Sequence, residues 1–191
     1  MTGYTEDRSE QPGSQLRVWI WVAAALILLL PAIAMPFTDA VSWTVSDFAF
    51  ASVLLFGSLG AYDFAARRVA ITAYRAGAGL AIAGVFLLAW INGAVGLTDS
   101  AADGLYLGVV AVGLIGASVA RLRPKGMVYA MGATALAQAL VGPIALVAGI
   151  VPAYNSTFEI LGLTGFFVAL FAGSAWLFWE AANGRTGQGA A

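Results

Sequence analysis

Residues 103–125 read DGLYLGVVAVGLIGASVARLRPK, and this stretch contains an apolar block together with its two charged ends. The block from Gly104 to Ala120 carries no charge, since Asp103 precedes it and Arg121 follows it. A helix needs about 20 apolar residues to cross a hydrocarbon core about 30 Å thick. The stretch therefore predicts a transmembrane helix over 103–121, with an acidic end and a basic end.

Five further blocks of the same kind occur in the chain. The six predicted spans are 17–36, 45–66, 75–97, 103–121, 127–151 and 157–180. The polar ends, 1–14 and 183–191, are predicted to be disordered tails, which leaves 15–182 as an all-α transmembrane domain. Composition agrees, because 61% of the residues are hydrophobic and 10% are charged, whereas soluble domains have about 25% charged residues.

The first block has an alternative interpretation as a cleaved signal peptide. Ala32-Ile33-Ala34 resembles a small-residue cleavage site. Against this, the polar segment before the block is long and contains acidic residues, whereas signal peptides begin with a basic region. Cleavage would leave five spans, with the N-terminus outside.

The basic residues fix the predicted orientation. With the N-terminus inside, every lysine and arginine falls on the cytoplasmic side. The only charged residues in the outer turns are then the acids Asp39, Asp99 and Asp103. Basic residues are enriched in cytoplasmic loops of membrane proteins. We therefore expect six spans with both termini in the cytoplasm. The basic residues are Arg8, Arg17, Arg67, Arg68, Arg75, Arg121, Arg123, Lys125 and Arg185.

Absent residue types limit the chemistry. The chain has no cysteine and no histidine, which removes thiolate chemistry, disulfides and the usual ligands of zinc, haem and iron–sulfur clusters. No P-loop or G-x-S-x-G motif occurs, and Lys125 is the only lysine. The net charge of −1 argues against a nucleic-acid partner. We expect no catalytic residues, no bound metal and no cofactor.

A spacing of 56 residues links three helix starts. Ser/Thr-x-x-Asp/Glu boxes begin at Thr44, Ser100 and Ser156. Small residues recur at the same step, with Gly57 and Gly60 mapping to Gly113 and Gly116. The spacing predicts a helical-hairpin repeat of about 56 residues, present in two complete copies and a third split between the last and first helices. A compact bundle with approximate threefold order would follow.

The acids of these boxes are Asp47, Asp103 and Glu159. One interpretation is an outer acidic rim that attracts cations. The other is local capping, in which the hydroxyl accepts from a free amide of the helix and the acid reaches back to the cap residue. The capping interpretation explains all three acids without a further assumption.

Three polar residues inside the spans are candidates for a polar path. Asp63 lies near the inner end of its span, and an acid within a membrane is often functional; Arg67, four residues on, could equally form an ordinary helix ion pair with it. Asn92 and Gln138 lie deeper, and each could line a cavity or form one interhelical hydrogen bond. Pro143, soon after Gln138, predicts an irregular helix there.

Five short motifs lie within or beside the predicted spans. They are Trp43-x-x-x-Asp47-Phe48, Leu54-Leu-Phe-Gly57, Ala61-Tyr62, Ala120-Arg-Leu-Arg-Pro-Lys-Gly126 and Ala133-Thr-Ala-Leu-Ala-Gln-Ala139. With these motifs the chain resembles a group of uncharacterised small inner-membrane proteins from proteobacteria. The resemblance covers about 17–180 and implies a bacterial inner membrane, but no activity.

Two functions remain open. The first is an accessory or structural membrane protein that acts through contacts with lipid, with a second copy of itself or with another membrane protein. The second is a small transporter or channel for a proton, cation or small solute, with a polar path near Gln138, Asn92 and Asp63. A polar cavity reaching Gln138 would favour transport.

Overall fold

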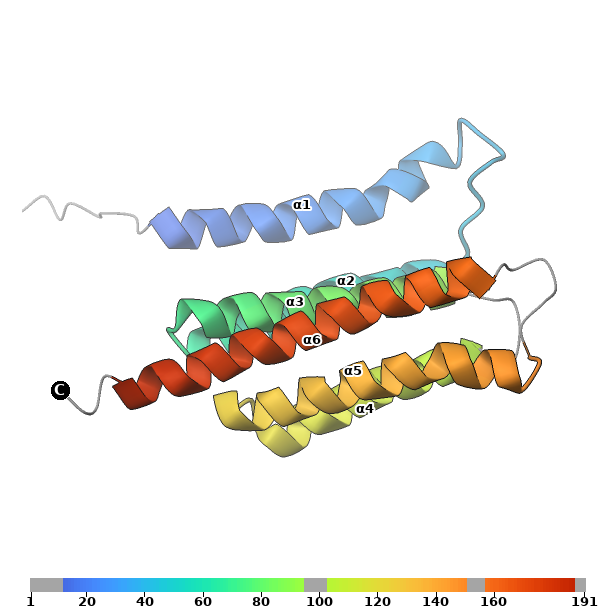
Figure 1. Ribbon diagram of the computed structural model, residues 1–191. Helices are drawn as coiled ribbons and strands as arrows, with labels where there is room; N and C mark the ends of the chain where they lie inside the picture. Colours follow the sequence, from blue (N-terminus) through green and yellow to red (C-terminus); the bar gives the residue numbers. More distant parts are fainter. Residues whose placement is uncertain (1–11, 95–102, 151–156, 188–191) are drawn as a thin grey trace, which may run out of the picture. The chain divides into compact units, whose positions relative to one another are not determined.

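The computed structural model describes residues 12–94, 103–150 and 157–187 (Figure 1). Every regular element in these ranges is an α-helix. The helices are α1 (Pro12–Ala34), α2 (Val45–Arg68), α3 (Thr72–Ala94), α4 (Asp103–Ala120), α5 (Pro124–Val147) and α6 (Thr157–Gly187).

All six described helices are long and apolar enough to cross a membrane. The prediction of six apolar helices is therefore confirmed, and such helices suggest a multi-pass membrane protein. The helix ends differ from the prediction. The first helix begins at Pro12 rather than 17, and the last continues to Gly187, into the tail predicted to be disordered. Hydropathy marks where the apolar residues stop, whereas a helix continues until its backbone is interrupted.

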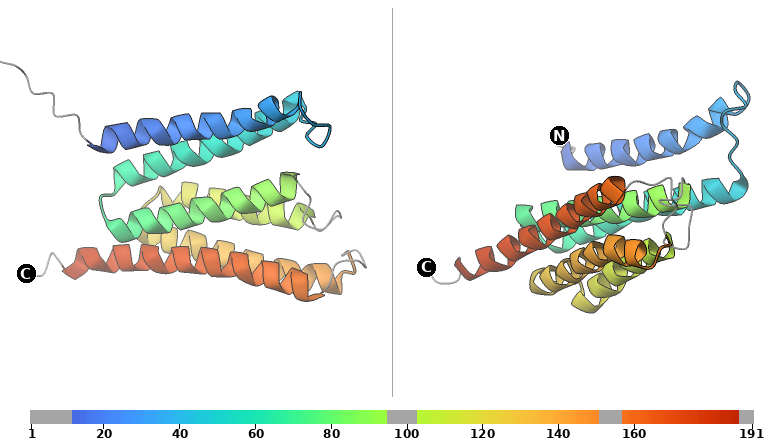
Figure 2. Two further views of the ribbon diagram at one scale, coloured as in Figure 1. Left: turned by 90° about the horizontal axis from the view of Figure 1, so that it is seen from above. Right: turned by 45° about the vertical axis from the view of Figure 1, so that its right-hand side comes forward.

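The chain divides into two compact units, Met1–Leu59 and Gly60–Ala191. In the second unit, α3 contacts α4 and α6, and α5 contacts the same two helices. Each of the four helices therefore has two neighbours, which closes a ring. Figures 1 and 2 show these helices running lengthwise beside one another. This is the up-and-down arrangement of a four-helix bundle.

Buried side chains on the bundle helices alternate at steps of four and three residues. On α6 the residues with this spacing are Ile160, Thr164, Phe167, Phe171, Ser174, Phe178 and Ala181, and Ala182 is buried as well. On α5 they include Met127, Met131, Thr134, Gln138, Val141 and Ala145. A mean step of 3.5 residues keeps one seam of each helix facing its partners, as in coiled coils. The core of the second unit lies along these seams.

Two of the bundle helices end in the same backbone motif. After α5, Gly149 adopts a left-handed conformation with φ +63°, and Ile150 N–H donates to the Ala145 carbonyl. After α4, Arg121 takes the left-handed place with φ 50°, and Leu122 N–H donates to the Ala117 carbonyl. Both are Schellman motifs, which satisfy carbonyls that a helix end leaves free. The second motif turns the chain directly into α5.

The first unit contains α1 and most of α2. The rings of Trp21 and Phe56 stack nearly parallel, with centroids 5.9 Å apart. Ala24 of α1 and Ala51 of α2 are buried in this unit. A proline lies inside α1, at Pro31, and another inside α5, at Pro143, yet both helices continue past these residues.

The 56-residue repeat stays a prediction. Two glycines at equivalent steps, Gly57 and Gly113, have different surroundings. A Cβ added to Gly57 would meet no described atom of another element within 4 Å, whereas one added to Gly113 would lie 3.4 Å from Thr134 Oγ1. Gly116 lies against Ala130, whereas a Cβ added to its counterpart Gly60 would meet no described atom within 4 Å. Equivalent positions in the sequence therefore do not have equivalent packing.

Candidate functional site

The predicted cap at the start of α2 is confirmed. The Thr44 backbone N–H donates to Asp47 Oδ2 at 2.7 Å, and the Thr44 hydroxyl donates to the same oxygen at 2.8 Å. The Asp47 N–H in turn reaches Thr44 Oγ1 at 3.4 Å. This reciprocal pattern is a capping box. The carboxylate of Asp47 is thus held by the helix that it begins.

The other two boxes are described only in part. Asp103 and Glu159 lie in the first turns of α4 and α6, as predicted. Their box partners, Ser100 and Ser156, lie outside the described residues. An acid in the first turn suits the positive end of the helix dipole, which holds for all three acids.

Asp63 pairs with Arg67. Arg67 donates to Asp63 Oδ2 through Nη2 at 2.8 Å and through Nε at 3.1 Å. The arginine side chain is 61% exposed and that of Asp63 is 24% exposed. Arg75 donates its Nε proton to the Ala66 carbonyl in the same region. The pair is the ordinary i, i+4 arrangement that the sequence allowed.

Asn92 joins two helices. Its Nδ2 donates to the backbone carbonyl of Asp103 at 3.0 Å, which connects the end of α3 to the start of α4. The interhelical hydrogen bond that was one of its two predicted roles is present. The bond brings Asn92 and Asp103 together, and the side-chain amide of Asn92 thus has a structural role.

Gln138 is the exception among the candidates. Its side chain is fully buried in α5. Within the described part of the chain, neither Oε1 nor Nε2 has a hydrogen-bond partner. Gln138 therefore does not make the single interhelical hydrogen bond considered for it, and it is not bonded to Asn92 or Asp63. The three residues of the predicted polar path are not joined by hydrogen bonds.

A second buried polar group lies on the facing helix. Thr164 of α6 is buried, and its Oγ1 has no hydrogen-bond partner among the described residues. The Tyr106 side chain, from α4, lies close to Thr164 without forming a hydrogen bond with its Oγ1. Sequence reasoning considered only amides and acids within the spans and missed Thr164. Its signal was its place in the four-three spacing with Phe167 and Phe171.

Other buried hydroxyls have partners. Ser174 donates to the Gly77 carbonyl of α3 at 2.8 Å, and Thr134 donates to the Ala130 carbonyl of its own helix at 2.8 Å. Tyr74 donates its phenolic proton to the Leu122 carbonyl at 2.7 Å. These bonds satisfy polar groups inside an apolar core, as buried polar groups require.

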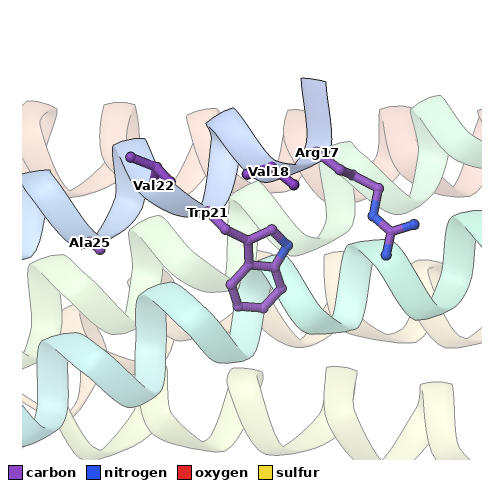
Figure 3. A pocket seen from close by; sticks show the side chains of 5 residues that line it. All are labelled: Arg17, Val18, Trp21, Val22 and Ala25. Atoms are coloured by element: carbon purple, nitrogen blue, oxygen red, sulfur yellow. The ribbon is translucent and has the colours of Figure 1, made fainter. Parts of the chain in front are cut away.

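A shallow cavity of about 410 Å³ lies along α1, lined by side chains from successive turns (Figure 3). Arg17 lies at one end and Ala25 at the other, with Val18, Trp21 and Val22 between them. The cavity thus has a basic residue at one end and an otherwise apolar wall. This cavity does not include Gln138.

The described ranges contain no group of three or more acids that could hold a metal ion. The candidate residues therefore cap a helix, form an ion pair and join two helices. Two buried residues, Gln138 and Thr164, keep polar atoms without a hydrogen-bond partner. Comparisons of the chain with models of protein families, with curated proteins and with solved structures find no match.

Proposed function

We propose that this chain is a multi-pass protein of the bacterial inner membrane that acts as an accessory helix bundle, through contacts with lipid or with another membrane protein. The observation that carries the proposal is that three of the polar candidate residues already make structural interactions within the protein. Asp47 caps a helix, Asp63 pairs with Arg67, and Asn92 joins α3 to α4. A transport path needs polar groups that are available to a solute.

The surface of α1 supports the same proposal. Most of its large apolar side chains are exposed, among them Trp19, Leu26, Ile27 and Ile33. A helix that is apolar all round suits lipid or a membrane-embedded partner. Arg17 adds a positive charge beside the apolar wall of the cavity, as an anionic lipid headgroup would require. Lipid is therefore the first partner that the proposal names.

The location and orientation within this proposal rest on charge. Placing both termini in the cytoplasm puts all nine lysines and arginines on one side. The resemblance to proteobacterial inner-membrane proteins supports the same membrane. The proposal includes no enzyme activity, since the chain lacks histidine and cysteine and offers no nucleophile–base pair in its motifs.

The second candidate function is transport of a proton, a cation or a small solute. One observation favours it: Gln138 is buried with its amide unsatisfied. A midspan amide without a partner is a group that a passing solute could bind.

Flux measurements separate the two functions. We expect proteoliposomes containing the wild-type protein to pass protons, potassium ions and glycerol at the rate of empty liposomes. Gln138→Leu and Asp63→Asn should not change that rate. Thr134→Val is a matched control, because Thr134 is buried in the same helix but is bonded within it. Wild-type flux above that of empty liposomes, lost in Gln138→Leu but kept in Thr134→Val, would favour the transporter.

A further inference from the structure

The α5–α6 interface contains three buried polar atoms that the protein itself does not satisfy. They are Oε1 and Nε2 of Gln138 and Oγ1 of Thr164. Buried polar groups are nearly always hydrogen-bonded to protein or to ordered water. Leaving them without a partner costs the full desolvation of each group. Three such atoms on two facing helices therefore indicate a partner that belongs to neither helix.

The two residues lie close along the interface. Gly142 follows Gln138 by four residues, so both lie on one face of α5. A Cβ added to Gly142 would come within 2.8 Å of Thr164 Oγ1. Thr164 is thus seated on the turn next to Gln138, in a notch that the missing side chain of Gly142 provides. Cβ positions four residues apart on a helix are neighbours, about 5–6 Å from each other. The Thr164 hydroxyl, which lies beside the Cβ position of Gly142, is therefore a neighbour of the Gln138 side chain.

One further polar group lies near Thr164. Tyr106 reaches it from α4, so a third helix contributes a hydroxyl. The amide and the two hydroxyls are all uncharged. They match a small neutral ligand that both donates and accepts hydrogen bonds.

We propose that Gln138 and Thr164 bind an ordered internal water in the core of the α3–α6 bundle. The water accepts a hydrogen bond from the Gln138 Nε2–H and donates one hydrogen bond to Gln138 Oε1 and one to Thr164 Oγ1. A buried water typically makes about three hydrogen bonds to groups that are otherwise unsatisfied. The close approach of Thr164 to Gly142 favours an occupant of this size over a larger solute. The site goes beyond the accessory function proposed above and does not depend on it.

The first test measures whether the Tm of a Gln138 variant lies below or above that of the wild type. Gln138→Met keeps the length of the side chain and removes its polar atoms. If a water satisfies the amide, the variant loses those hydrogen bonds, and we expect its Tm to fall by about 2–6 °C. If the core is dry, the variant removes two unsatisfied groups and its Tm rises. Thr134→Val is the matched control and should change the Tm little. It removes the Thr134 hydroxyl, but the Ala130 carbonyl that accepts from this hydroxyl keeps its backbone donor in the helix.

The second test asks whether the two residues share one ligand. Thr164→Val should lower the Tm in the same way, and the double variant should lose less than the sum of the two single losses. The third uses the wild-type chain in detergent micelles: a nuclear Overhauser effect between water and the Gln138 side-chain amide is expected. A rise in Tm for Gln138→Met, strict additivity, or no such effect in the wild type would each overturn the proposal.

Discussion

Replacing Tyr74 by alanine is expected to lower the free energy of unfolding by about 3–5 kcal/mol, the range for removing a large buried aromatic side chain. Tyr74 is fully buried near the start of α3. Its ring packs edge to face against Phe178 of α6, with centroids 5.1 Å apart. Its hydroxyl donates to the Leu122 carbonyl in the α4–α5 turn. One side chain therefore connects α3 with α6 and with the turn after α4.

A second variant separates the two contributions. Tyr74→Phe keeps the ring and removes the hydroxyl, which leaves the Leu122 carbonyl without its donor. We expect a loss of about 1–2 kcal/mol, as for one buried hydrogen bond. Leu122 has a left-handed φ of 57°, so losing this bond should also loosen the turn.

Unfolding of the purified protein in mixed micelles, followed by circular dichroism, measures both variants. Tyr129→Phe is the matched control, because Tyr129 is 79% exposed on α5. It should leave the unfolding free energy unchanged within about 0.5 kcal/mol. Equal effects of Tyr74→Phe and Tyr129→Phe would show that the Leu122 hydrogen bond does not stabilise the bundle.

Gly126→Ala is expected to destabilise the α4–α5 hairpin by about 1–3 kcal/mol, the usual cost of overpacking. An added Cβ would lie 2.8 Å from Ala120 Cβ, 3.0 Å from its Cα and 3.2 Å from its carbonyl oxygen. These atoms belong to backbone and to a short side chain, so no flexible group can move aside. The end of α4 would have to shift, together with the Schellman motif that follows it.

The matched control lies in the same helix. Gly132→Ala adds the same methyl group to α5, at a position where the added Cβ would meet no described atom within 4 Å. There the change should be neutral, or stabilising by up to about 1 kcal/mol, because alanine favours helix more than glycine does. The same unfolding measurement compares the two. Similar stabilities of the two variants would contradict the close approach of α4 and α5 at Gly126.

Local sequence determined the features that were predicted well. A block of apolar residues bounded by charges is enough to indicate a long helix, and all six blocks are helical. The cap at Thr44 and the pair at Asp63 depend on residues three or four positions apart, so the sequence contains both partners. Such features need no knowledge of the tertiary fold.

Burial could not be predicted in the same way. Phe166 and Phe167 are adjacent and identical in type, yet Phe166 is 50% exposed and Phe167 is fully buried. In a helix that is apolar all round, composition does not distinguish the face toward lipid from the face toward a neighbouring helix. The four-three spacing on α6 held that information, but Thr164 and Ser174 occupy two of its positions and obscure the aromatic pattern.

The candidate site shows the same limit. Gln138 and Asn92 are both amides within spans, and the sequence assigned them the same two alternatives. Their difference depends on which atoms a neighbouring helix presents: Asn92 meets a helix-start carbonyl, whereas Gln138 meets none in the described structure. The surroundings of Gln138 depend on the fold, because Thr164 of the facing helix is 26 positions away in the chain.

Cysteine labelling tests the central claim, a chain that crosses the membrane repeatedly with its termini inside. The chain has no cysteine of its own, so single variants can be labelled without background. Three matched alanines are exposed in the structure: Ala40 between α1 and α2, Ala70 between α2 and α3, and Ala111 within α4. A membrane-impermeant maleimide applied to spheroplasts should label Ala40→Cys at once, Ala70→Cys only after permeabilisation, and Ala111→Cys in neither case. Labelling of Ala111→Cys as fast as Ala40→Cys, or of Ala70→Cys in intact spheroplasts, would contradict the account.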